Sequence, residues 1–168
     1  MKNLRNVFAA SLFIVSSFYA QAQSKVAHIN TQELVESMPE MMSAKSELEK
    51  LAKTYETDIQ AMATELQNKI KQYDAESSTK TDEENGKRLQ EVQSMEQSIR
   101  QYQGQAQQDL QKKEIELLKP ITEKAKDAIL KVGNDQGFNY VLDSSQGQGV
   151  IMANGKDLLA DVKAELGF

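Results

Sequence analysis

Apolar residues recur along the middle of the chain at helical spacing, in two stripes separated by a polar stretch. Each stripe advances in steps of three or four and repeats every eleven residues, with one interruption at Lys113. An eleven-residue period lies close to the natural period of the α-helix, so the stripes predict two long, nearly straight helices. The stripes are Leu48, Leu51, Tyr55, Ile59, Met62, Leu66, Ile70 and Tyr73, then Leu89, Val92, Met95, Ile99, Tyr102, Ala106, Leu110, Leu117 and Ile121.

An apolar stripe this narrow must face a partner, and the nearest partner of each stripe is the other. The polar stretch between them predicts a turn, so we expect an antiparallel helical hairpin with its tip near 74–82. Ser37 and Glu40 fit a capping box that would start the first helix. Thr81 and Glu84 fit a second capping box that would start the return helix.

The same pattern suggests which residues of the two helices lie opposite each other. Folding the chain about the polar stretch pairs residues whose numbers add up to about 155, such as Met62 with Val92 and Leu66 with Leu89. Gly104 would then lie opposite Leu51 and Tyr55 and make room for their side chains. Glu or Asp often stands four residues before Lys or Arg, which predicts ion pairs along the outer surface of each helix. These pairs are Glu49/Lys53, Glu65/Lys69, Glu83/Lys87, Glu84/Arg88, Glu96/Arg100 and Asp109/Lys113.

Both prolines of the chain bracket this region. Pro39 and Pro120 stand at its ends, and six of the eight glycines follow residue 132. Helix breakers are therefore concentrated outside 39–120, which we predict to be a coiled-coil arm. Because prolines weaken or bend helices, Pro39 and Pro120 are the candidate pivot of the arm.

The flanking segments, 23–38 and 121–168, predict a small body that contains β-strands. Strands are expected at 25–29, 138–143 and 150–153, with a hairpin turn at 144–149 and a short helix at 158–166. The fold class is thus α+β, predominantly α. Three short strands are marginally stable alone, so we expect them to pair between chains in a homo-oligomer. The alternative is a monomeric α+β domain with a long helical insertion.

The first residues have the features of a secretory signal peptide. Lys2 and Arg5 precede a mostly apolar run, and Ala20-Gln21-Ala22 supplies a cleavage site, so we expect 1–22 to be removed. The apolar run is too short for a membrane anchor, since a hydrocarbon core is about 30 Å thick. The prediction is export to the periplasm without stable membrane insertion.

Charge and composition exclude several classes of protein. Without Lys2 and Arg5 the basic residues fall from 20 to 18 against 25 acidic ones, which gives a net charge of about −7. Nucleic-acid binding needs clustered Lys and Arg, so we expect no nucleic acid as partner. The chain has no cysteine, and an exported protein of this size must then depend on packing or on association with other chains.

No pattern of catalytic or cofactor-binding residues is visible. His28 is the single histidine and has no cysteine or second histidine to form a transition-metal site, so we assign it a structural role. Gly147 and Gly149 lack the third glycine and the following helix of a dinucleotide-binding loop. The sequence also has no phosphate-binding loop for ATP. We therefore predict that the protein is not an enzyme and has no cofactor, metal or catalytic residue.

A few apolar residues fall outside the stripes, close to the two prolines. Methionine suits surfaces that accept varied partners, because it is flexible and polarizable. Two interpretations remain open: these residues contact a client protein, or they pack the arm against the body. The candidates are Met38, Met41, Met42, Ile115 and Leu118.

The order of these elements resembles the Skp/OmpH family of periplasmic chaperones. The residues that carry the resemblance are "INTQELVESMPE" before the arm and "ITEKAKDAILKVGNDQGFNYVLDSS" after it, and the likeness covers essentially the whole chain after the signal peptide. The resemblance implies a trimer with arms that enclose a cavity. It also implies an ATP-independent holdase that binds unfolded outer-membrane β-barrel proteins there and prevents their aggregation.

One departure from the family bears on the partners. The best-known member is strongly basic, whereas residues 39–120 of this chain hold 16 acidic and 12 basic residues. The acidic charge argues against lipopolysaccharide binding and against electrostatic capture of clients. A rival interpretation also remains, in which the protein is a structural or adaptor coiled coil of the cell envelope that binds one folded partner.

Overall fold

The computed structural model describes residues 24–168, and the expected signal peptide lies outside these described residues. The described chain divides into two compact units. One unit, here called the hairpin unit, comprises residues 35–123. The other, the small unit, comprises residues up to 34 together with 124–168. Each unit has its own arrangement of secondary structure.

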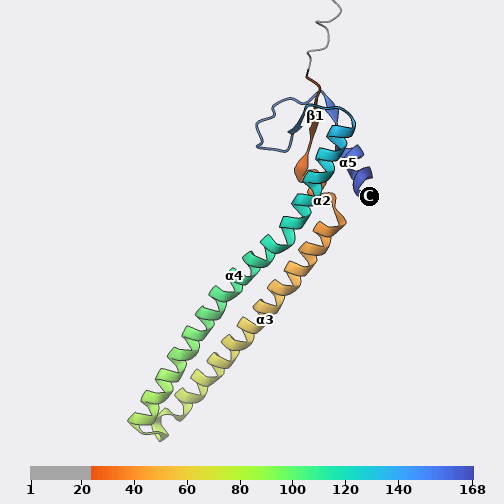
Figure 1. Ribbon diagram of the computed structural model, residues 1–168. Coiled ribbons are helices and arrows are strands. Elements are labelled where there is room, and N and C mark those ends of the chain that lie inside the picture. The colour runs from red at the N-terminus through yellow and green to blue at the C-terminus, as the bar shows by residue number, and fades with distance from the viewer. Residues whose placement is uncertain (1–23) are drawn as a thin grey trace, which may run out of the picture. The chain divides into compact units, whose positions relative to one another are not determined.

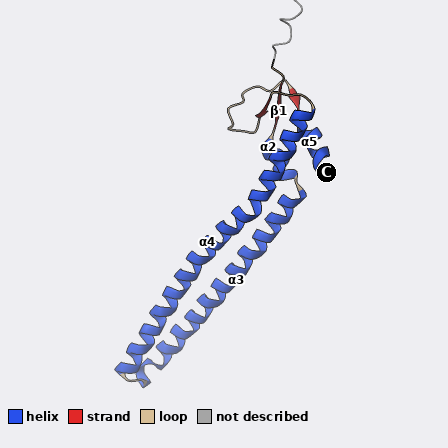
Figure 2. Cartoon of the chain, viewed as in Figure 1, coloured by secondary structure: helices blue, strands red, loops and turns tan. Residues whose placement is uncertain are grey.

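The hairpin unit is built from two long antiparallel helices, as the stripes predict. Helix α3 (Pro39–Glu76) and helix α4 (Asp82–Asp135) run side by side (Figures 1 and 2) and are joined by a 3₁₀ turn, η2 (Ser77–Thr79). Helix α4 continues through Pro120 and contributes its last residues to the small unit. The predicted helical hairpin is confirmed.

One of the two predicted capping boxes is present and the other is wrong. The Thr81 hydroxyl accepts from the backbone N–H of Glu84 (3.2 Å), and the Glu84 carboxylate accepts from the backbone N–H of Thr81 (3.0 Å). Ser37, however, is the last residue of helix α2 (Thr31–Ser37), and Met38 takes the N-cap position of α3. The ring of Pro39 disfavours a helical conformation at the residue before it, and Met38 is accordingly extended, with φ −69° and ψ 134°.

The small unit contains a three-stranded parallel sheet. Strand β1 (Val26–Ile29) lies in the centre, with β2 (Tyr140–Asp143) on one side and β3 (Lys156–Asp157) on the other. Val26 pairs with Tyr140, and Ala27 pairs with Lys156. The strands pair within one chain, so the expected pairing between chains is not needed to form this sheet.

The predicted strand at 150–153 and the hairpin turn before it are wrong. Residues 144–155 form a loop that connects two strands parallel to β1, and Ile151 is fully exposed in it. The pairing with β1 begins only after Gly155, where Ala27 pairs with Lys156. The backbone N–H of Leu158 then donates to the His28 carbonyl (3.0 Å). The third strand therefore forms after the apolar run and not within it.

A compact core fills the small unit. Ile29, Leu34, Leu158 and Val162 are each no more than 1% exposed. Helix α5 (Leu159–Leu166) contributes Val162, and one face of α4 contributes Ala125, Ala128 and Val132, all buried. Gly133 allows β2 to approach α4, because a Cβ there would lie only 3.0 Å from Val141.

Asp143, at the end of β2, ties the sheet to the start of α2. Its carboxylate accepts from the Thr31 hydroxyl (2.6 Å) and from the Ser145 hydroxyl (2.7 Å) and backbone N–H (2.9 Å). Partial burial by itself would raise the pKa of Asp143, but the hydrogen bonds from Thr31 and Ser145 outweigh it and lower the pKa. Asn30 caps α2 by accepting from the backbone N–H of Glu33 (3.0 Å).

Candidate functional site

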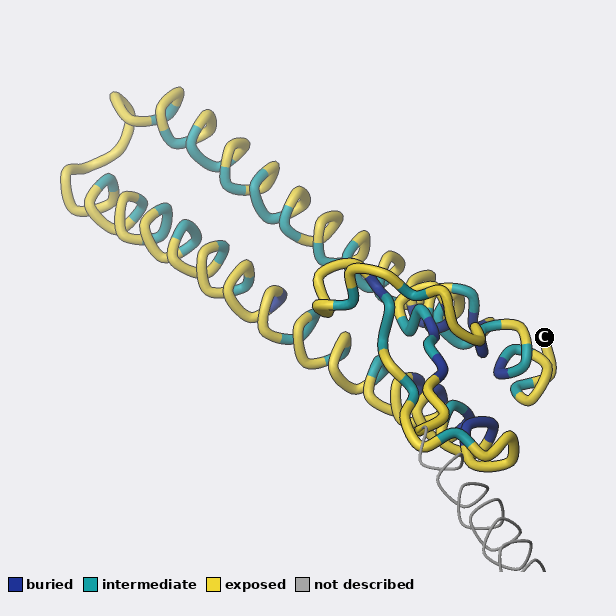
Figure 3. The backbone as a smooth tube through the Cα atoms, turned by 90° about the horizontal axis from the view of Figure 1, so that it is seen from above, coloured by how far each residue is buried: buried dark blue, intermediate teal, exposed yellow. Residues whose placement is uncertain are grey.

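The two apolar stripes meet along a seam in the hairpin unit. Most stripe residues are half-buried, and their positions lie on the facing sides of α3 and α4 (Figure 3). Ala106 and Ile121 are buried at 4% and 6% exposure, whereas Leu89 is 59% exposed. The stripes therefore identify the seam correctly except at Leu89.

The register of the seam differs from the predicted one. Three cross-helix pairs have residue numbers that add up to 160 instead of 155: Glu47 with Lys113, Asp58 with Tyr102, and Lys69 with Glu91. Met62 accordingly shares a pocket with Met95 and Ile99 and not with Val92. The expected place of Gly104 is also wrong, since it is exposed and an added Cβ would meet no atom within 4 Å.

One side of the seam carries a row of polar contacts between the helices, which we call the polar edge. The Lys113 ammonium pairs with Glu47 (2.7 Å), and the Tyr102 hydroxyl donates to Asp58 (2.7 Å). The Tyr55 hydroxyl donates to Asp109 (3.0 Å), and its ring packs edge-on against Tyr102 at 5.8 Å. The polar edge consists of Glu47, Tyr55, Asp58, Lys69, Tyr73, Glu76, Arg88, Glu91, Tyr102, Asp109 and Lys113.

These contacts shift the pKa values of the groups that make them. The hydrogen bond to Asp58, together with partial burial and the nearby carboxylate charges, raises the pKa of Tyr102 to about 12. The hydrogen bond to Asp109 likewise raises the pKa of Tyr55. Hydrogen bonds from Lys69 and Tyr73 lower the pKa of Glu91. The phenols of Tyr55 and Tyr102 therefore keep their protons to higher pH, and the Glu91 carboxylate keeps its charge to lower pH, which are the states in which they form these bonds.

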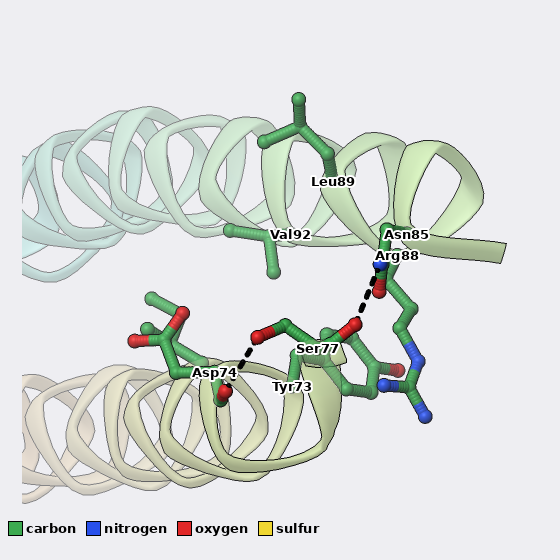
Figure 4. Close-up of a pocket in the computed structure, with 8 residues that line it drawn as sticks. Tyr73, Asp74, Ser77, Asn85, Arg88, Leu89 and Val92 are labelled. Atoms are coloured by element: carbon green, nitrogen blue, oxygen red, sulfur yellow. Dashed lines mark hydrogen bonds between the residues drawn. The ribbon is translucent and has the colours of Figure 1, made fainter. Parts of the chain in front are cut away.

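The tip of the hairpin is closed by side chains from both helices. The Arg88 guanidinium lies 4.6 Å from the centre of the Tyr73 ring and pairs with Glu76. The Asn85 amide donates to the Ser77 carbonyl (3.0 Å), as Figure 4 shows. In the same view Val92 points towards α3, whereas Leu89 points away from it. The polar stretch at the tip thus takes part in specific contacts between the two sides of the hairpin, and the turn itself is confined to 77–81.

A groove with different chemistry lies on the other side of the seam. Three adjoining pockets, of ≈ 550, 340 and 370 Å³, follow one another here: Gln60 lines the first and second, and Ile70 lines the second and third. We call the three pockets together the amide groove, because glutamine is the most frequent polar residue in their lining. Tyr55, Tyr73 and Arg88 line the groove and also belong to the polar edge. The full lining is Ala52, Tyr55, Glu56, Ile59, Gln60, Ala63, Thr64, Leu66, Gln67, Ile70, Tyr73, Asp74, Ser77, Asn85, Arg88, Leu89, Val92, Gln103, Ala106, Gln107 and Leu110.

Comparison with known proteins now assigns the chain to a family. The family model described as outer membrane protein (OmpH-like) matches residues 25–166. The chain belongs to the OmpH-like family. That match spans both the hairpin unit and the described part of the small unit.

Individual OmpH-like relatives agree with this assignment. The chaperone protein Skp of Pectobacterium atrosepticum is 26% identical over 151 residues, which cover 90% of each chain. The chaperone protein Skp of Photorhabdus luminescens is 26% identical over 162 residues, covering 96% of this chain and 97% of the relative. The crystal structure of a candidate OmpH-like outer membrane chaperone from Caulobacter crescentus CB15 has a TM-score of 0.78 over 88% of this chain and 86% of its own, at 19% identity. This structure shares the α+β fold.

The off-stripe candidates have different environments in this OmpH-like chain. Met38 is fully buried, and Met41 and Leu118 are half-buried. Met42 and Ile115 are 62% and 60% exposed. Their numbers add up to 157, so the register places these two exposed residues at nearly the same level of the hairpin. Of the five candidates, Met42 and Ile115 are therefore the ones accessible to a partner in the single chain.

The two candidate pivot residues have different positions in their helices. Pro39 is the first residue of α3, where its missing N–H costs little. Pro120 lies inside α4, where it can donate no hydrogen bond to the preceding turn. The bond lost is the one that the Glu116 carbonyl would accept from position 120. The Thr122 hydroxyl donates to the nearby carbonyls of Leu118 (3.1 Å) and Lys119 (2.9 Å) and does not replace it. Pro120 is thus the weaker point of the two helices.

The described residues offer little for chemistry. Among them no group of three or more His, Asp or Glu side chains is placed to hold a metal ion. Within 24–168 no helix combines the length and apolar character needed to cross a membrane. His28 lies half-buried in β1 with its Nδ1 3.4 Å from the Ser144 hydroxyl, a position consistent with the structural role assigned to it.

Sequence analysis missed the polar edge and the amide groove. A signal for the first was present, because Glu47, Asp58 and Lys69 are spaced by eleven residues and so are Glu91, Tyr102 and Lys113. Reading the polar positions at the period found for the apolar ones would have revealed both rows. Instead, Lys69, Arg88 and Lys113 were assigned to partners along their own helices, whereas the structure pairs them across the hairpin.

Proposed function

We propose that the protein is an ATP-independent holdase chaperone of the periplasm, which binds unfolded outer-membrane β-barrel proteins and keeps them from aggregating. The observation that carries the proposal is membership of the OmpH-like family over 25–166, with curated relatives that are chaperones. The hairpin unit fits this task, because its long surface offers many weak contacts and no single tight site.

The proposal includes an oligomer, a trimer by family resemblance, whose arms surround the client. It assigns 39–120 to the arm, 23–38 and 121–168 to the oligomerising body, and 1–22 to a removed signal peptide. Support for association comes from the sheet, where Val26, Tyr140 and Leu142 are 43%, 59% and 44% exposed. Val26 pairs with Tyr140, and Leu142 lies two residues further along β2, so the three side chains share one face of the sheet. An exposed apolar face of this kind suits contact with other copies of the chain.

Sedimentation of the purified protein tests the oligomer. We expect a species larger than one chain at micromolar concentration, and the substitutions Tyr140→Ser with Leu142→Ser should dissociate it. A monomer of the unaltered protein would contradict this part of the proposal.

An aggregation assay tests the chaperone function. A urea-unfolded outer-membrane β-barrel protein is diluted into buffer with increasing amounts of this protein, and light scattering is followed. We expect suppression at stoichiometric amounts without ATP. The acidic charge of the hairpin argues against electrostatic capture of clients. The protection of the barrel protein against aggregation should therefore change little between low and physiological salt. Unchanged scattering would sink the proposal, and selective, tight binding of one folded envelope protein would favour the adaptor interpretation.

Spin labels on the arms test the candidate pivot. The substitution Pro120→Ala restores a backbone N–H in the middle of α4, so the distribution of distances between arms should narrow. Pro39→Ala changes only the first residue of α3 and should have the smaller effect. An unaltered distribution in both variants would exclude a pivot at these residues.

A further inference from the structure

The two sides of the seam differ in charge in a regular way. On α3 the polar-edge residues Glu47, Asp58 and Lys69 are eleven apart, and the groove residues Ala52, Ala63 and Asp74 form a second row with the same spacing. The rows are offset by five residues, which is about 140° around a helix. One repeat therefore builds two faces, one whose row on α3 is bonded to α4 and one whose row is not.

The amide groove is nearly free of charge. Of the residues that line its three pockets, only Glu56, Asp74 and Arg88 are charged. The charge of Arg88 is balanced, because Arg88 pairs with Glu76. Glu96, which lies on α4 outside the three pockets, is 3.8 Å from Arg100. For a hairpin in which charged residues dominate the outer surface, this face is suited to an uncharged partner.

The polar groups that remain in the groove suit the backbone of another chain. Gln60, Gln67, Gln103 and Gln107 carry side-chain amides, each with donors and an acceptor like those of a peptide group. Between them lie small or apolar side chains such as Ala63 and Ile70. An extended segment could satisfy its N–H and C=O groups at the amides and place apolar side chains in the pockets.

The length of the groove matches the length of a transmembrane β-strand. Its lining extends from Ala52 of α3 to Ser77 in η2, about 37 Å at ~1.5 Å per residue. An extended chain covers this distance with about 11 residues at ~3.3 Å each. A transmembrane β-strand has about 9–11 residues and is uncharged on its lipid-facing side.

We propose that the amide groove is the face of the hairpin that receives the client, binding one strand-length, uncharged segment lengthwise along α3, with α4 contributing to the lining at both ends. The inference rests on the proposed function and adds to it which face is used and what it recognises. The row Glu47, Asp58 and Lys69 of the polar edge is bonded to α4, so the client approaches from the side of the row Ala52, Ala63 and Asp74.

Photo-crosslinking locates the client on the hairpin. A photoreactive side chain is placed at Gln67 or Gln103 in the groove, at Ser98 on the side of the polar edge, or at Gln101, which lines none of the three groove pockets. Each protein is mixed with the urea-unfolded barrel protein and irradiated. We expect strong cross-links to the barrel protein from positions 67 and 103 and weak ones from 98 and 101. Equal yields from all four, or cross-links from the groove to a second copy of this chain, would overturn the inference.

A matched pair of charge variants measures the contribution of the groove. Gln103→Glu with Gln107→Glu places two carboxylates in it, and Gln101→Glu with Gln108→Glu adds the same charge to exposed positions of the same helix that line none of the three pockets. An uncompensated carboxylate against an apolar segment is unfavourable, so the first variant should bind the barrel protein about tenfold more weakly. The second should stay close to the unaltered protein, and circular dichroism should show both folded.

The outcomes separate the inference from the proposed function. If the unaltered protein does not hold the barrel protein, the proposed function fails and the inference falls with it. If the unaltered protein holds it and the two charge variants bind equally well, the function stands and the groove is not the receiving face.

Discussion

The small unit and the hairpin unit are stabilised in different ways. The small unit buries Ile29, Leu34, Leu158 and Val162 almost completely, whereas the seam of the hairpin leaves most of its apolar residues half-buried and adds polar contacts along one edge. A well-packed core depends strongly on each large residue in it. The stability of a long seam is the sum of many weak contacts. Residues on its surface can therefore take part in binding without a large loss of stability.

The largest expected effect comes from the core of the small unit. Leu158→Ala removes a side chain with no exposed surface and should lower the free energy of unfolding of this unit by about 3–4 kcal/mol. Leu130→Ala is the matched control, because Leu130 is 52% exposed, and should cost under about 1 kcal/mol. Denaturant unfolding followed by circular dichroism measures both, and equal losses would mean that the two units do not differ as described.

A second effect depends on pH. Asp143→Asn weakens the hydrogen bonds from Thr31 and Ser145 and should cost about 2 kcal/mol at pH 7. The pKa of Asp143 in the folded protein lies below its ordinary value of 3.8. Its contribution to the free energy of unfolding is therefore present above pH 3.8 and is lost as the pH falls through the folded-state pKa. The stability difference between variant and unaltered protein should therefore shrink on acidification. A difference that stays constant down to pH 2 would refute this origin.

A leucine of the seam should matter less than one of the core. Leu66→Ala removes a half-buried side chain and should cost about 1 kcal/mol. Leu89→Ala should cost less still, since Leu89 is 59% exposed although it belongs to the same stripe. If Leu66→Ala proved as costly as Leu158→Ala, the contrast between seam and core would be lost.

The smallest expected effect concerns a single phenol. The pKa of Tyr102 is about 12 against an ordinary value of 10.0, chiefly through its hydrogen bond to Asp58. Native Tyr102 holds its proton more tightly than the unfolded chain does, so its contribution is complete below about pH 10 and is lost as the pH rises towards 12. Ultraviolet titration should show a late-ionising tyrosine that shifts to lower pH in Asp58→Asn. A titration curve identical in the two proteins would argue against the polar edge.

The sequence predicted the parts of the fold that follow from periodicity. The two helices, their facing stripes and the Thr81 cap are confirmed, because each depends on local spacing. The register could not be found this way, since sliding one stripe past the other by whole turns keeps both in contact. The polar pairs across the hairpin, such as Glu47 with Lys113, show that the sum is 160 and not 155.

The remaining errors concern interactions that are distant in the sequence. The prediction of a strand at 150–153 was wrong because the segment that pairs with β1 lies later in the chain, at Lys156–Asp157, and the apolar run does not reveal this pairing. The amide groove was missed because glutamine and alanine carry no signal until the polar rows fix which side of the seam they occupy. The off-stripe apolars were recognised, but only the structure separates buried Met38 from exposed Met42.

The antiparallel register is the claim on which the polar edge and the amide groove both depend, and cross-linking of paired cysteines tests it directly. Cysteines at Met62 and Ile99, which line one pocket, should join rapidly with a short bifunctional maleimide. Cysteines at Met62 and Val92 should join slowly, because Val92 lies seven residues, about 10 Å, further along α4. Faster joining of 62 with 92 than of 62 with 99 would contradict the register and the two faces built on it.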